Sequence, residues 1–180
     1  MFFDMKPWSE ICIKESGEPF AEIPSCLLRL LPHPYISKGA PYENGADPFW
    51  LRDGVLKRLL IAQKSLAENC PECQLAIFDA WRPIAVQQFM YDLAIHQECQ
   101  IRGCPSIELL GDHDQKKVLE AVQNFWALPT TDPLTPPPHS TGAAIDITLA
   151  DLQGIPIDMG GEIDFIGDIS NPNYYKNIAE

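Results

Sequence analysis

Three stretches of the chain carry apolar residues at the spacing of an amphipathic helix. Asp53 is typical of a helix N-cap, and the pattern behind it continues to Pro71, so we expect a helix between them. Pro83 suits the first turn of a second helix, and a third is predicted over residues 114–126. The apolar positions that support these helices are Val55, Leu56, Leu59, Leu60 and Leu66, then Val86, Phe89, Met90 and Leu93, then Val118, Val122, Phe125 and Trp126.

Two shorter runs predict strands. Residues 74–78 form an apolar run before a charged turn, as in a buried strand, and residues 143–149 alternate between two faces. A turn over 151–154 then leads to an expected edge strand at 155–157. Prolines interrupt the first 50 residues, where we expect short strands and loops. Ile145, Ile147 and Leu149 share one face of the second run, and Ala144, Asp146 and Thr148 share the other.

Composition and charge narrow the classes of partner. The 180 residues suit one domain, and 13 Lys and Arg against 25 Asp and Glu give a net charge of -12. That charge repels phosphate backbones and anionic lipid, so we expect no nucleic-acid or membrane partner. The chain has no apolar run of membrane-spanning length, and Met1–Pro7 carries an acid and a proline where an export signal is basic and then apolar. We therefore expect a cytoplasmic protein.

The six cysteines allow a metal site of their own. Without an export signal they are expected to be reduced thiols rather than a disulfide framework. Cys70-Pro71-Glu72-Cys73 is a C-x-x-C motif, and Cys99 and Cys104 follow it along the chain. A four-thiolate zinc site would need both pairs to converge in tetrahedral geometry. The alternative is that these are ordinary half-buried cysteines.

The segment from His139 to Asp146 is the most informative for chemistry. A histidine precedes a Ser-Thr-Gly turn, and seven residues later an aspartate projects from the predicted strand. On one straight strand the two side chains would face opposite ways, but a chain reversal at Gly142 lets His139 fold over the face of Asp146. Imidazole and carboxylate are common zinc ligands, and the stiff, proline-rich loop over 128–138 would fix the direction of His139. The other interpretation is a loop histidine beside an aspartate bonded to a turn.

Two further residues stand at positions suited to binding. Arg82 follows the buried strand between Trp81 and Pro83, where its guanidinium could hold a carboxylate or a developing oxyanion, or form a structural salt bridge. Asp164 follows two glycines and lies between apolar neighbours, so it could receive an ammonium group or cap a turn.

Together these segments resemble the D-alanyl-D-alanine dipeptidases, zinc peptidases related to D,D-carboxypeptidases and the Hedgehog signalling domain. The shared motifs are D-x-x-R-P (Asp79 to Pro83), the H-S-x-G-x-A-I-D run (His139 to Asp146) and M-G-x-x-I-D-F (Met159 to Phe165). The resemblance implies one zinc ion, with His139 and Asp146 as two of its three protein ligands. It also implies that Arg82 stabilises the oxyanion and that Asp164 binds the substrate's amino group. The implied reaction is the hydrolysis of D-Ala-D-Ala by metal-activated water.

One family feature is not found in the sequence. The family takes its third zinc ligand and its general base from an E-x-x-H segment, and no such segment follows Asp146. We therefore expect residues 1–180 to be a single peptidase-like domain that lacks this segment and its strand, with a bare sheet edge that would favour homo-oligomers. The alternative function is a catalytically silent domain that binds the dipeptide or a peptidoglycan fragment. The fold class expected from the resemblance is α+β, with a small, mostly antiparallel sheet and helices packed on one side.

Overall fold

Strand β4 (Cys73–Asp79) is the central strand of the larger sheet. The computed structural model describes residues 11–163, 165, 167–171 and 173–177 of the chain. In it β4 pairs in parallel with β2 (Leu28–Arg29) and antiparallel with β5 (Asp146–Asp151). Six of the seven β4 residues are buried, which explains the nearly continuous apolar run that predicts this strand.

A second, two-stranded sheet leads into the first long helix. Strand β1 (Phe20–Glu22) pairs antiparallel with β3 (Trp50–Arg52), and α2 (Asp53–Asn69) follows β3 without a loop. The predicted helix is confirmed, but the expectation that Asp53 is its N-cap is wrong, because the extended backbone of β3 makes Arg52 the cap. Asp53 is the first helical residue, and its carboxylate accepts from Lys57 at 2.6 Å.

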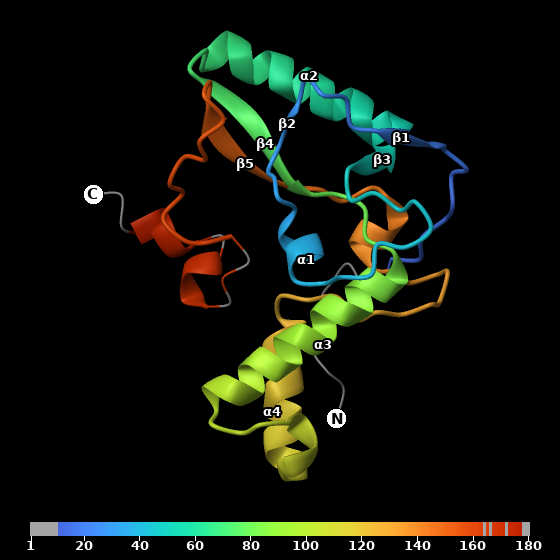
Figure 1. Ribbon diagram of the computed structural model, residues 1–180, viewed down its shortest axis with the longest axis vertical. Coiled ribbons are helices and arrows are strands. Elements are labelled where there is room, and N and C mark those ends of the chain that lie inside the picture. Colours follow the sequence, from blue (N-terminus) through green and yellow to red (C-terminus); the bar gives the residue numbers. More distant parts are fainter. Residues whose placement is uncertain (1–10, 164, 166, 172, 178–180) are drawn as a thin grey trace.

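Helix α2 covers one face of the larger sheet (Figure 1). Side chains of β4 alternate, so Leu75 and Ile77 point toward α2 whereas Phe78 points to the other side. Leu56 and Leu59 of α2 complete this core, as their helical spacing predicts. The buried members of the cluster are Ile23, Leu27, Phe49, Leu51, Leu56, Leu59, Leu75, Ile77 and Ala80.

A second core joins the remaining helices. The remaining α-helices are α1 (Pro34–Ser37), α3 (Ile84–Ile101) and α4 (Asp112–Gln123). Helices α3 and α4 lie beyond the end of β4 that carries Asp79 (Figure 1). The predicted helix that starts at Pro83 and the predicted helix over 114–126 are confirmed as α3 and α4. Each helix end that the sequence predicted lies within three residues of the observed end. The buried members of this cluster are Tyr35, Ala40, Phe78, Val86, Met90, Tyr91, Ala94, Val122 and Trp126.

Strand β5 begins three residues later than its alternating pattern predicts. Ile77 pairs with Ile147, and the register then shifts so that Asp79 faces Asp146. Ile147 is 46% exposed, because β5 is the last strand of its sheet and little covers it. The expected edge strand at 155–157 is reduced to one bridge between Ala150 and Pro156.

Short 3₁₀ helices complete the described chain. They cover Ile107–Leu109, Pro138–Thr141, Asp168–Ser170 and Tyr174–Asn177. Mixed small sheets with separate helices confirm the α+β class. Within the residues that the structure describes, no helix combines the length and the apolar character needed to cross a membrane.

Gly142 closes the turn between Pro138–Thr141 and β5, and its substitution tests this packing. Its φ is +72°, and a Cβ atom there would overlap the Phe20 ring. We expect Gly142→Ala to lower the free energy of unfolding by about 2–4 kcal/mol, from left-handed strain plus overpacking. Gly103→Ala is the matched control, because its φ is also +72° but a Cβ there meets nothing within 4 Å. Equal losses in urea unfolding would show that Phe20 is not seated against Gly142.

Candidate active site

The Asp79 carboxylate lies at the centre of a polar cluster at the end of β4. It is fully buried, and both of its oxygens have partners. Oδ1 lies 3.0 Å from Nε2 of His33 and accepts from the Tyr42 hydroxyl at 3.2 Å. Oδ2 accepts from Nε of Arg82 at 2.6 Å. A buried charge is costly unless it is paired and hydrogen-bonded, so these contacts are what keep a carboxylate stable here.

His33 is held in a defined orientation on the far side of that carboxylate. It is 3% exposed and forms the N-cap of α1, where its Nδ1 accepts from the backbone N–H of Ile36. Because Nδ1 accepts, Nε2 carries the hydrogen that is donated to Asp79. Tyr42 is a second neutral donor, since burial and the nearby charge of Asp79 raise its pKa far above the ordinary value. Asp79 is therefore fixed from two sides before it meets Arg82.

Arg82 connects Asp79 to Asp146. Its Nη2 donates to Oδ2 of Asp146 at 2.7 Å and to the Tyr35 hydroxyl at 3.1 Å, and its Nη1 lies 3.4 Å from the amide oxygen of Gln87. Burial lowers the pKa of the guanidinium, but the charges of Asp79 and Asp146 outweigh burial and raise it overall. Arg82 thus stays cationic although it is only 5% exposed. Tyr35 and Trp126 pack against its plane, with centroids 4.9 and 5.3 Å away.

His139 lies across from Arg82, and its ring is locked by the backbone of the β4 end. Its Nδ1 approaches the carbonyl oxygen of Ala80 at 2.6 Å, so the hydrogen sits on Nδ1. Nε2 is left with a lone pair and lies 3.4 Å from Oδ2 of Asp146. Orientation of a metal-binding imidazole by a backbone carbonyl on its other nitrogen is a common arrangement in metal sites.

The path of the chain explains why His139 and Asp146 meet. Pro137 is fully buried and precedes the 3₁₀ turn that carries His139. Gly142 then takes a left-handed conformation, and the chain turns into β5, where pairing with β4 places Asp146 opposite Asp79. The turn at Gly142 that the spacing requires is therefore present, and it brings the imidazole to the carboxylate.

Asp146 is the exposed side of the site. Its side chain is 38% exposed, against 0% for Asp79. Burial raises the pKa of Asp146, but the neighbouring imidazole of His139 and the charge of Arg82 hold it below its usual range. The carboxylate is ionised at neutral pH and open to a ligand.

Asp79, His139 and Asp146 each place one potential ligand atom within 4.8 Å of the others. The ligand types suit zinc, and so does the distance between two of the ligand atoms. Two ligands about 2.0–2.2 Å from a tetrahedral zinc ion lie about 3.4 Å apart. Nε2 of His139 and Oδ2 of Asp146 show this separation, at 3.4 Å. The residues present therefore fit a metal at this point.

Three of the four residues singled out in the sequence are thus brought together: Arg82, His139 and Asp146. Asp164 lies outside the described residues.

The four-thiolate alternative is wrong for the described chain. Cys70 and Cys73 flank the turn between α2 and β4, and the one further potential ligand that joins them is Glu72 rather than a cysteine. Cys99 and Cys104 lie at the far end of α3 (Figure 1).

Sequence reasoning assigned no role at the site to His33 or Tyr42, and noted Asp79 only as part of a motif. His33 and Asp79 are 46 residues apart, so no local periodicity links them. A weak signal exists in His33-Pro34, because a proline in the first helical turn marks the preceding residue as an N-cap. That signal predicts a capping histidine but not its partner.

Comparisons with known proteins agree with the resemblance. A family described as D-ala-D-ala dipeptidase matches residues 33–180. A protein of Synechocystis sp. (strain ATCC 27184 / PCC 6803 / Kazusa) named D-alanyl-D-alanine dipeptidase is 46% identical over 181 residues, which cover 99% of this chain and 72% of that protein. No solved structure gives a significant match. The matched family model spans most of the chain and includes all the residues of the site, so the chain belongs to the D-Ala-D-Ala dipeptidase family of peptidases.

Proposed function

We propose that the chain hydrolyses D-Ala-D-Ala at a zinc ion held by His139 and Asp146. The observation that carries this proposal is the pairing of a locked imidazole with a half-exposed carboxylate. Nδ1 of His139 is committed to Ala80, and Nε2 lies 3.4 Å from Asp146, the spacing of two ligands on one ion. When bound, zinc lowers the pKa of its water toward about 7 and polarises the scissile carbonyl.

Asp79 does not belong to the proposed ligand set. It lies 3.4 Å from Nδ1 of His139, the nitrogen that carries hydrogen, whereas Asp146 lies beside Nε2. One ion cannot bind on both sides of the same ring. The oxygens of Asp79 are also occupied by His33, Tyr42 and Arg82. Its role is to position Arg82 and to hold a compensating negative charge beneath it.

Arg82 is the proposed oxyanion-stabilising residue. Its contacts with Asp79, Asp146, Tyr35 and Gln87 use four of the five guanidinium N–H groups, counted over the described residues. One N–H of Nη1 remains for the substrate oxygen that becomes negative as water adds to the carbonyl. A donor that is already oriented costs no reorganisation when that charge develops.

The substrate's ammonium group is assigned to Asp164, on the pattern of the Met159 to Phe165 segment. D-Ala-D-Ala has one cation, and a carboxylate between apolar neighbours would bind it strongly. The net charge of -12 also favours the approach of a cationic end.

The direct test is D-alanine release from D-Ala-D-Ala by the purified, zinc-supplemented chain. Three protein ligands are usual in catalytic zinc sites, so zinc binding and turnover are measured separately. We expect release that depends on zinc. A folded, zinc-loaded chain that releases no D-alanine would overturn the proposal. If that inactive chain still retained the dipeptide in equilibrium dialysis, the alternative function of a catalytically silent binding domain would replace the proposal.

Asp146→Asn tests the metal ligand. An amide oxygen binds zinc weakly, so we expect zinc affinity at this site and kcat/KM to fall by more than about 100-fold. Asp151→Asn is the matched control at the other end of β5. Its Oδ1 accepts from the backbone N–H groups of Gln153 and Ile155, which an asparagine can still satisfy. Zinc-dependent activity that survives Asp146→Asn would remove Asp146 from the ligand set.

Arg82→Lys tests the oxyanion donor while it keeps a positive charge beside Asp79. An ammonium cannot reach Asp79, Asp146 and a substrate oxygen together, so we expect kcat to fall about 10²–10³-fold with a smaller change in KM. Arg102→Lys is the control, because Arg102 pairs with Glu98 on the surface of α3. A rise in KM with kcat unchanged would make Arg82 a substrate-binding residue instead.

Asp164→Asn tests the ammonium site by substrate comparison. For free D-Ala-D-Ala we expect KM to rise at least about tenfold, because a charge-assisted hydrogen bond is lost. N-acetyl-D-Ala-D-Ala has no ammonium group, so its kinetics should be unchanged by the substitution. Asp168→Asn, in the same segment, is the control. Equal losses for the two substrates would show that Asp164 acts on the structure and not on the amino group.

A further inference from the structure

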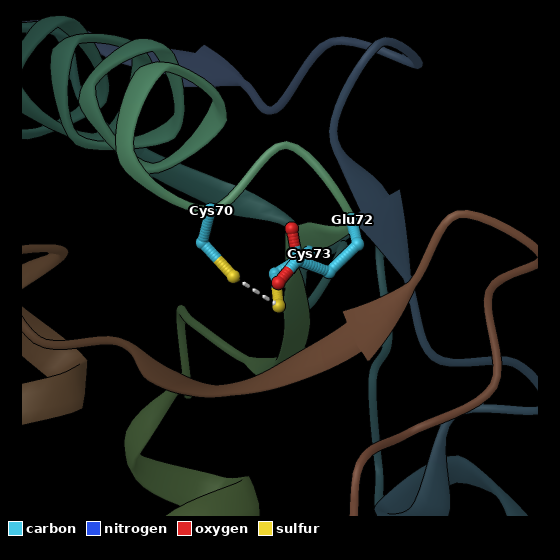
Figure 2. Close-up of side chains that lie close together, drawn as sticks. All are labelled: Cys70, Glu72 and Cys73. Atoms are coloured by element: carbon cyan, nitrogen blue, oxygen red, sulfur yellow. Dashed lines mark hydrogen bonds between the residues drawn. The ribbon is translucent and has the colours of Figure 1, made fainter.

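The turn between α2 and β4 brings two thiols and a carboxylate together. The Sγ atoms of Cys70 and Cys73 are 2.6 Å apart, and Figure 2 shows the Glu72 side chain beside them. One potential ligand atom from each of the three residues lies within 4.8 Å of the others. The proposed peptidase site does not use this cluster.

The backbone fixes this arrangement. Cys70 caps the C-terminus of α2, and its N–H donates to Leu66 at 2.7 Å. Pro71 restricts the next step, and the N–H of Cys73 donates back to the carbonyl of Cys70 at 2.9 Å, which closes a four-residue turn. Cys73 then enters β4 opposite Asp151. Helix and strand therefore hold the two cysteines on one side of a short turn.

We propose that Cys70, Glu72 and Cys73 bind a thiophilic divalent cation, with Zn²⁺ as the natural candidate. Thiolates with C-x-x-C spacing are typical zinc ligands, and a carboxylate can complete a set of three. Each thiol gives up its proton to solvent on binding, and nothing is oxidised or reduced. The strongly acidic chain, with its net charge of -12, favours a cation here as well.

A cation and a disulfide make different demands on this turn, because the two sulfurs, now 2.6 Å apart, must separate to bind one ion. Two sulfur ligands about 2.3 Å from one tetrahedral zinc ion lie about 3.8 Å apart, a distance that rotation of the half-exposed Cys70 side chain can reach. A disulfide would join only the two sulfurs, whereas one ligand atom of Glu72 also lies within 4.8 Å of them. A cation uses all three groups and neutralises the carboxylate.

This site is separate from the peptidase site. Cys73 and Asp79 are the first and last residues of β4, which places them about 20 Å apart along an extended strand. The ligand types differ too, with two sulfurs at one end and imidazole and carboxylate at the other. The proposal therefore stands whether or not the chain hydrolyses D-Ala-D-Ala.

Cobalt(II) is the probe that separates the two sites, because only thiolate ligation produces intense sulfur-to-metal charge-transfer absorption. We expect this absorption when Co²⁺ is added to the reduced chain, and its loss when Zn²⁺ displaces the cobalt. Cys70→Ser and Cys73→Ser should each abolish it. Glu72→Gln should keep the absorption but weaken Co²⁺ affinity about tenfold.

Two matched variants serve as controls. Cys26→Ser removes an exposed cysteine outside the cluster, and Asp146→Asn alters only the peptidase site, so both should retain the absorption. Absence of the absorption in the reduced wild-type chain would overturn the proposal, as would absorption that survives Cys70→Ser or Cys73→Ser. If the reduced chain shows none and air oxidation removes two thiols per chain, the turn is a disulfide site instead.

Discussion

The charge of Asp79, buried at the end of β4, is the constraint on which the rest of the site depends. An ionised carboxylate with no exposure to solvent is stable only when nearby groups compensate it. Removing one partner of a buried pair costs roughly 3–5 kcal/mol, because the remaining charge is left unpaired. Arg82 must therefore stay where it is for the fold as well as for its proposed role in the reaction. Stability and the proposed catalytic geometry are coupled through this one contact.

The same pairing decides how precisely Arg82 is placed. A guanidinium on a flexible stem loses side-chain entropy when it is ordered, and here Asp79 and the ring of Tyr35 order it before any substrate arrives. His33 and Tyr42 in turn fix Asp79 from the opposite side. Burial thus decreases outward from Asp79 to Arg82 and finally to Asp146. The groups that would meet substrate are at the exposed end of a chain of contacts that begins in the core.

How much could be predicted from the sequence depended on the range of the contacts involved. Helix α2 and strand β4 were predictable because periodicity and a short apolar run are local signals. The meeting of His139 and Asp146 was predictable as well, since a single glycine turn relates them. The N-cap of α2 at Arg52 was missed, because β3 is only three residues long and leaves no periodic signal.

The remaining errors concern contacts between distant segments. His33 reaches Asp79 across 46 residues, and nothing in either local pattern requires it. The four-thiolate alternative failed for a related reason. C-x-x-C spacing indicates two possible metal ligands, but it does not indicate which other residues lie beside them. Cys99 and Cys104 were plausible by count, but α3 carries them away from the α2–β4 turn (Figure 1). Tertiary placement decided both cases.

Three aspartates of β4 and β5 show how different surroundings give identical side chains different roles. Asp79 is buried and uses both oxygens on neighbouring donors, so it positions other residues. Asp151 uses its carboxylate on the backbone of the following turn, so it stabilises a hairpin. Asp146 is partly exposed and lies 3.4 Å from Nε2 of His139. A metal ligand must be reachable and must have a second ligand atom beside it, and among these three carboxylates that combination is found at Asp146.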